Sequence, residues 1–120
     1  MAGNLNMLDC IQMEITALGN YDYTCTRGFE IVDVLAAMDA SPIGGANTTL
    51  QRQALGVGAF NGVAGAINVG TVNQMVRADT FVDAQMTCAG TDILRALVAG
   101  AAAPTADIFI FVIPTTWIAG

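Results

Sequence analysis

Three stretches of the chain are apolar on both faces of an extended strand. The clearest is IFIFVI, residues 108–113, which follows an aspartate and ends before a proline. Residues 29–38 and 92–99 contain a few charges but also lack a face of polar side chains. A strand with one face in water alternates apolar and polar residues. These three strands are therefore expected to be covered on both sides.

Shorter patterns predict the rest of the fold. Gly, Pro, Asn and Asp cluster at short intervals along the chain, and short runs between such turn residues are typical of β-sandwiches and barrels. We predict an all-β protein of a single domain, an antiparallel β-sandwich of jelly-roll type. The expected strands are residues 10–16, 21–26, 29–38, 47–55, 92–99 and 107–114.

The turns between these strands predict how they pair. Residues 47–55 follow a Gly-Gly turn, so they are expected to form a hairpin with residues 29–38. Residues 92–99 and 107–114 are expected to form a C-terminal pair. Simple alternation along 29–38 places Ile31 on the face opposite Val32 and Val34.

Three parts of the chain leave alternatives open. Residues 10–16 alternate as a half-buried strand does, but a helical stripe fits them as well. Residues 71–88 fit two strands, or a strand and a helical turn. Residues 1–20 are interpreted as an N-terminal arm or a first strand, ahead of a sandwich domain over residues 21–120.

A similarity between two stretches of the chain, called here the echo, places two charged residues at matched positions. TCTRGFEIVDVLAA, residues 24–37, resembles TCAGTDILRALVA, residues 87–99. Asp33 and Arg95 occupy matched positions in the echo, and both interrupt apolar strands, so they are a possible ion pair. If the pair were buried, loss of one partner would cost about 3–5 kcal/mol. The alternative places both charges near solvent.

The composition carries more apolar surface than a chain of this size hides by itself. Apolar residues make up 54% of the 120 residues and charged residues 12%, whereas about a quarter of a typical domain is charged. A domain of this length buries only about two-thirds of the surface that its unfolded chain exposes. The excess has to be covered by a membrane, a lipid ligand or another subunit.

We expect another subunit to cover this excess apolar surface. The run 108–113 is far shorter than the ~20 residues of a spanning helix, and the longer stretch 54–70 contains glycines and asparagines that disfavour insertion into lipid. No membrane partner is therefore expected; the alternative is that loops such as 54–70 cover the outer faces. The candidate interface and core residues are Val32, Val34, Leu94, Val98, Ile108, Ile110 and Phe111.

Charge and reactive residues exclude several functions. The net charge is −6, and the only positive side chains are four scattered arginines, so no nucleic-acid partner is expected. The chain contains no histidine, no lysine and one serine, which removes the usual nucleophilic pairs, phosphate-loop lysines and histidine-bound metals. We expect no enzyme activity, no cofactor and no metal.

The cysteines and the N-terminus point to a reducing compartment. Cys10, Cys25 and Cys88 are odd in number and show no C-x-x-C spacing, so we expect three reduced thiols. A disulfide between two of them is the alternative. The first residues lack the basic and apolar segments of a secretory signal, which favours synthesis in a cytoplasm.

Two stretches resemble a known class of proteins. YTCTRGFEIVDVLAAMDASPIGGANTTLQRQ, residues 23–53, resembles small head proteins of tailed bacteriophages, and RADTFVDAQMTCAGTDILRALVAG, residues 77–100, with the closing strand 107–113, fits the same pattern. The similarity covers residues 21–114 and is to capsid decoration, or cement, proteins. It implies a β-sandwich that forms a homotrimer or sits at capsid symmetry axes and clamps neighbouring major capsid protein subunits in the virion.

Two other functions remain open. One is a carbohydrate-binding β-sandwich of a head fibre, which would use exposed aromatic side chains, with Tyr21, Tyr23 and Trp117 as candidates. The other is a shell subunit that assembles by itself.

Overall fold

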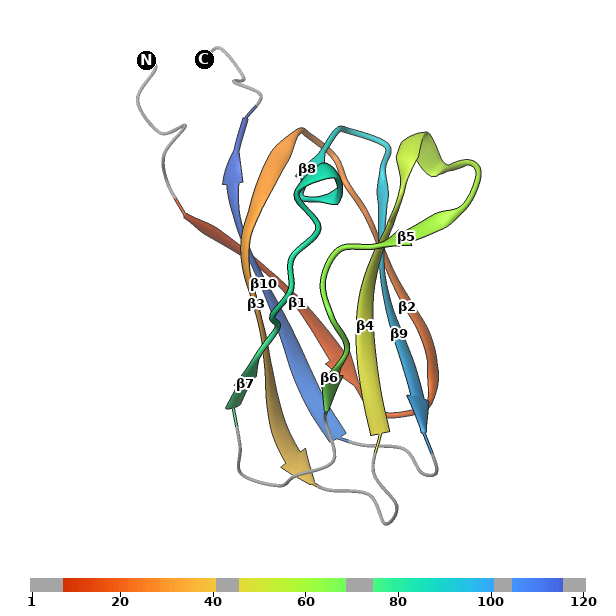
Figure 1. Ribbon diagram of the computed structural model, residues 1–120, viewed down its shortest axis with the longest axis vertical. Helices are drawn as coiled ribbons and strands as arrows, with labels where there is room; N and C mark the ends of the chain where they lie inside the picture. Colours follow the sequence, from red (N-terminus) through yellow and green to blue (C-terminus); the bar gives the residue numbers. More distant parts are fainter. Residues whose placement is uncertain (1–7, 41–45, 69–74, 101–104, 116–120) are drawn as a thin grey trace.

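Two antiparallel sheets pack face to face in the computed structural model, which describes residues 8–40, 46–68, 75–100 and 105–115 (Figure 1). The first, called here the β10 sheet, has β10 between β1 and β3, with β7 and β8 both pairing β3. Its strands are β1 (Asp9–Ile15), β3 (Phe29–Ala40), β7 (Met75–Arg77), β8 (Thr87–Cys88) and β10 (Thr105–Pro114).

The second sheet, called here the β9 sheet, has the order β2-β9-β4-β5, with β6 also pairing β4. Its strands are β2 (Gly19–Thr24), β4 (Ala46–Gln53), β5 (Phe60–Gly62), β6 (Ile67–Asn68) and β9 (Ile93–Gly100). Two short 3-10 turns, η1 (Ala54–Gly56) and η2 (Asp83–Gln85), lie between strands. The predicted all-β sandwich is confirmed, and residues 9–15 form a strand rather than a helix.

The strand order is that of a jelly roll. The first strand pairs with the last, β1 with β10, and the nesting continues inward with β2 beside β9, β3 beside β7 and β4 beside β5. Successive strands β1, β2, β3 and β4 alternate between the two sheets (Figure 1). This nested arrangement is a pair of Greek keys closed into a sandwich.

The predicted hairpin and the predicted C-terminal pair are both wrong. β3 and β4 belong to different sheets, and so do β9 and β10. A Gly-rich turn marks a reversal of the chain, but the reversed chain can join either sheet. Passing to the opposite sheet places one face of each strand in the shared core, which a local turn rule does not register. The segment 71–88 contains elements of both alternatives, namely β7, η2 and β8.

The core lies between the sheets. Five of the seven interface and core candidates are buried in it. They are Val34, Leu94, Val98, Ile108 and Ile110. The other two, Val32 and Phe111, lie on the outer face of the β10 sheet, where Val32 is exposed and Phe111 half-buried. Residues 1–7 lie outside the described residues, so the N-terminal arm stays a prediction.

A β-bulge explains why Val32 and Val34 do not share a face. Phe111 lies opposite Asp33 and Val112 lies opposite Ile31, so Val32 is an extra residue in β3. The bulge turns both Ile31 and Val34 into the core, whereas strict alternation predicted opposite faces. The amide of Val34 donates to Oδ1 of Asp33 at 2.9 Å, which supports the bulged backbone.

Candidate interaction surface

The outer face of β10 is apolar although it points away from the core. Ile108, Ile110 and Val112 point inward and are buried. Because side chains alternate along a strand, the residues between them point outward, and they are half-buried: Phe109, Phe111 and Ile113. This confirms that the C-terminal run is a central strand with two apolar faces, one of which lies in the sandwich core.

Neighbouring strands extend this apolar surface. Phe109 lies opposite Leu35 of β3, and Val32 lies at the bulge, next to the pair of Phe111 and Asp33. On the other side Phe109 faces Gln12 and Phe111 faces Cys10, both on β1. The apolar residues form a band two strands wide, called here the outer strip. It comprises Val32, Leu35, Phe109, Phe111 and Ile113.

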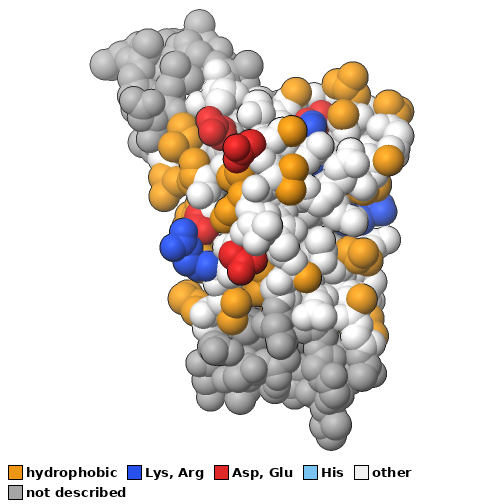
Figure 2. Space-filling view, viewed as in Figure 1, with side chains coloured by type: hydrophobic (Ala, Val, Ile, Leu, Met, Phe, Trp, Pro, Cys, Tyr) orange, Lys and Arg blue, Asp and Glu red, His pale blue; other side chains and the backbone are white. Residues whose placement is uncertain are grey.

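Acidic side chains border the outer strip. Glu14 lies opposite Asp107 at one end, and Glu30 lies opposite Ile113 at the other. Gln12 donates to Asp107 at 3.3 Å. In Figure 2 hydrophobic side chains lie along the left margin, over the β10 sheet, with charged side chains among them, and others lie along the right margin. Asp33 lies opposite Phe111, and the exposed Arg77 lies opposite Leu35. The strip therefore combines an apolar centre with a rim that is acidic except at Arg77.

The expected ion pair between Asp33 and Arg95 is not formed. Asp33 lies on β3 and pairs with Arg77 of β7, whose Nε is 3.1 Å from the carboxylate. Arg95 lies on β9, in the other sheet, and pairs with Asp22 of β2. Matched positions in the sequence echo fall on opposite sheets, so each charge finds its partner on the strand beside it.

The outer face of the β9 sheet is polar by contrast. Arg95 donates to both carboxylate oxygens of Asp22, at 2.8 and 3.0 Å, and its guanidinium lies 3.8 Å from the centre of the Phe60 ring. The residue opposite Arg95 on β4 is Gln51. Leu97 is exposed on this face and has Thr49 opposite it. Arginine thus shields the aromatic ring of this sheet.

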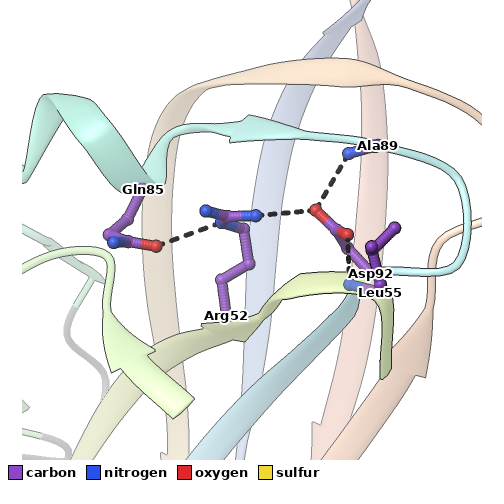
Figure 3. Close-up of polar contacts among 5 residues, drawn as sticks. All are labelled: Arg52, Leu55, Gln85, Ala89 and Asp92. Atoms are coloured by element: carbon purple, nitrogen blue, oxygen red, sulfur yellow. Dashed lines mark hydrogen bonds and ion pairs between the residues drawn. The ribbon is translucent and has the colours of Figure 1, made fainter. Parts of the chain in front are cut away.

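A buried polar cluster closes one end of the sandwich (Figure 3). The Asp92 carboxylate accepts hydrogen bonds from Arg52 at 2.8 Å, from the Leu55 amide at 2.8 Å and from the Ala89 amide at 2.9 Å. Arg52 also donates through Nε to Gln85 at 3.1 Å. The cluster joins β4, η1, η2 and the turn before β9.

Its electrostatics favour an ionised Asp92. Burial opposes ionisation, but the amides of Leu55 and Ala89 and the guanidinium of Arg52 outweigh it, so the pKa of Asp92 lies below its ordinary value. Leu55 adopts a left-handed backbone with φ of 55°, a conformation that is uncommon for leucine. Its hydrogen bond to Asp92 helps to hold it there, so the role of the cluster is structural.

Sequence reasoning missed this cluster and the pocket beside it. Arg52 and Asp92 are 40 positions apart, and Asp92 was expected to begin a strand, whereas it precedes β9. A pocket of about 420 Å³ lies next to them and is also bordered by Leu55 and Cys88. In the described ranges no group of three or more His, Cys, Asp or Glu is placed to hold a metal ion.

The two described tyrosines are poor platforms for sugars. Tyr21 is half-buried, and its hydroxyl accepts hydrogen bonds from the amides of Thr16 and Ala17 at 3.1 and 2.8 Å. Tyr23 is half-buried and packs against the core. Trp117, the third candidate, lies outside the described residues. No helix among the described residues is long and apolar enough to cross a membrane.

Comparisons with known proteins yield structural likeness only. No known protein family and no curated protein matches the chain. A chain from a structure of infectious bursal disease virus, Gx strain, aligns over 93% of this chain with a TM-score of 0.44 and 8% identity. The present chain spans about a third of that one, at 33%.

A mitogen from Yersinia pseudotuberculosis is also similar in structure. It aligns over 92% of this chain and 89% of its own length, with a TM-score of 0.40 and 8% identity. Likenesses this weak do not distinguish one function from another, since sandwiches of this type serve many unrelated purposes.

Proposed function

We propose that the chain is a structural, non-catalytic protein of the virion that decorates and stabilises a tailed-bacteriophage capsid. It is made in the host cytoplasm, oligomerises as a homotrimer on the shell, and has the major capsid protein as its second partner. The observation that carries the proposal is the outer strip on the central strand of a jelly roll. Jelly rolls are a common architecture of viral capsid domains.

The outer strip has the composition of a buried interface. Two phenylalanines stand in the middle of a sheet face, where water would otherwise meet them. Burying apolar surface is favourable by about 25 cal/mol per Å², and aromatic side chains dominate the energetics of interfaces. Covering the strip with a neighbouring copy removes this surface from water.

The acidic rim favours a partner with basic groups outside the strip. Glu14, Glu30 and Asp107 border it, and like charges brought together across a symmetric contact would repel each other. A copy therefore has to pack with its rim offset from this one, while the shell supplies basic side chains. Binding to the shell is then expected to weaken as salt rises.

The test combines mass and shell binding. Sedimentation of the purified chain is expected to give a trimer, and the chain should bind shells of its own phage that lack it. The Phe111→Asp variant should stay folded, remain monomeric and lose shell binding. A wild-type monomer whose shell binding is unaffected by this substitution would refute the proposal, because other parts of the chain would then have to cover the strip.

A second candidate function is a shell subunit that assembles by itself. The nested strand order supports it, because complete shells are also built from single jelly rolls. Electron microscopy of the purified chain separates the two: closed particles made without a second protein would favour the shell subunit, and discrete trimers would favour decoration.

A further inference from the structure

Two buried cysteines meet across the two sheets. Cys25 follows β2 of the β9 sheet, and Cys88 lies in β8 of the β10 sheet, opposite Phe29. Their exposed fractions are 2% and 1%, and both belong to the same core cluster.

Backbone hydrogen bonds fix this approach. The amide of Cys25 donates to the carbonyl of Asp92 at 2.8 Å, and the carbonyl of Cys25 accepts from the Thr91 amide at 2.8 Å. Thr91 and Asp92 belong to the turn that begins directly after Cys88. Cys25 is therefore held against the chain that carries Cys88, although 63 positions separate the two in sequence.

The two thiols also contact each other. The hydrogen bond to Cys88 lowers the pKa of the Cys25 thiol, and the same contact together with burial raises the pKa of Cys88. Cys88 borders the pocket of about 420 Å³ at the end of the sandwich, which gives small molecules a way to approach it. Neither cysteine takes part in the outer strip.

We propose that Cys25 and Cys88 are a redox-sensitive pair that forms a disulfide between the two sheets when the protein meets a small-molecule disulfide. The inference does not depend on the proposed virion function. A protein made in a reducing cytoplasm keeps both thiols, and the cross-link closes when it enters an oxidising medium.

The reaction is thiol–disulfide exchange in two steps. The Cys25 thiolate, which the contact with Cys88 favours, attacks one sulfur of the small disulfide, whose S–S bond breaks and releases one small thiolate. The Cys88 thiol then loses its proton, attacks Sγ of Cys25, breaks the mixed disulfide and releases the second small thiolate. The two protons lost by the cysteines are taken up by these thiolates. Two protein thiols are thus oxidised, and one small disulfide is reduced to two thiols.

Mass spectrometry of the full chain tests the pairing. The protein is treated with bis(2-hydroxyethyl) disulfide, unfolded and alkylated. We expect Cys25 and Cys88 to lose two hydrogen atoms and take no alkyl group, while Cys10, which is exposed, is either alkylated or capped by a single hydroxyethyl disulfide. Reduced protein should give three alkylated thiols.

The Cys10→Ser variant identifies the partners. Trypsin cleaves after arginine, so Cys10 and Cys25 share the fragment 1–27, and Cys88 lies in the fragment 78–95. In the variant, Cys25 is the one cysteine of the first fragment, so a cross-link between the two fragments joins Cys25 to Cys88. The disulfide should raise the melting temperature by roughly 10 °C, because it closes a long loop of the unfolded chain.

Matched variants complete the test. Cys25→Ser and Cys88→Ser should each abolish the rise in melting temperature on oxidation, and Cys10→Ser should retain it. Three alkylated thiols after oxidation of the wild type, or a cross-link that contains Cys10, would overturn the inference without touching the proposed role of the outer strip.

Discussion

The two outer faces of the sandwich differ although the two inner faces are built alike. Inside, both sheets contribute aliphatic side chains to a single core. Outside, the β10 sheet presents Phe109 and Phe111 in its centre, whereas the β9 sheet presents Arg95 held by Asp22 over Phe60. An arginine covers the outer aromatic ring of the β9 sheet, whereas the phenylalanines of the β10 sheet have the Asp33–Arg77 pair beside them and no arginine stacked on them.

This difference separates the positions that form the core from those that we propose to contact partners. Inner positions of both sheets bury the apolar area that stabilises the domain. Outer positions contribute little to the fold, so they are free to carry another purpose. In the β10 sheet that freedom has produced an apolar strip with an acidic rim, and in the β9 sheet a network of polar groups.

The largest effect is expected from the inner face of the central strand. Ile110 is 0% exposed. The change Ile110→Asp removes a packed side chain and buries a carboxylate, which costs at least about 5 kcal/mol. That is comparable to the whole stability of many domains, about 5–15 kcal/mol. Circular dichroism should show an unfolded chain at 25 °C. A folded variant would mean that this face is not the core.

The next effect compares the two outer faces. Phe111→Asp should leave the fold intact but weaken self-association by about thirtyfold or more, as expected for an aromatic residue central to an interface. Leu97→Asp, an equally drastic change on the outer face of the β9 sheet, should leave the oligomer unchanged. Sedimentation equilibrium measures both. Equal weakening by the two changes would remove the distinction between the faces.

How much of this could be predicted from the sequence depends on the range of each signal. The strands β9 and β10 follow from apolar runs, which are local. The bulge at Val32 has no local signal, because an extra residue leaves the composition of the strand unchanged. The two pairing predictions were wrong because turn residues specify a reversal but not the sheet that the chain then joins.

The candidate site divides in the same way. That β10 is apolar on both faces was predicted, but which of its residues point outward depends on the register with β1 and β3. Arg52 and Asp92 are brought together by the fold alone, and neither residue type nor spacing indicates their contact. Asp33 and Arg95 show the opposite error, because matched positions in the echo do not bring two residues together in the fold.

A smaller effect comes from the ion pairs on the two faces. The Arg77 side chain is 69% exposed and that of Arg95 is 26% exposed. In the monomeric Phe111→Asp background, Arg95→Ala should lower the free energy of unfolding by more than Arg77→Ala does, since it loses two parallel hydrogen bonds to Asp22 and the contact with Phe60. Arg77→Ala should cost less than about 0.5 kcal/mol.

Urea unfolding measures both values, and Arg95→Lys serves as a control. Lysine keeps the positive charge but cannot form two parallel hydrogen bonds to Asp22, so most of the loss should persist. Full retention of stability in the lysine variant would show that charge alone, and not the planar guanidinium, holds the outer face of the β9 sheet together.

The smallest effect is a pH dependence on the β9 face. Hydrogen bonds from Arg95 lower the pKa of Asp22 below its ordinary value of 3.8. A carboxyl whose pKa is lower in the folded state adds stability above its unfolded pKa and loses that contribution as pH falls through the folded value. The melting temperature of the wild type should therefore exceed that of Asp22→Asn at neutral pH, and the difference should shrink below pH 3.8.

Asp92 also has a lowered pKa, so it too contributes less stability in acid. Because Asp92 is present in both proteins, its contribution cancels in the difference. If the difference in melting temperature stays constant or widens on acidification, the contact between Arg95 and residue 22 does not depend on an ionised Asp22. The contact of Arg95 with Phe60 would then be what holds the guanidinium on this face.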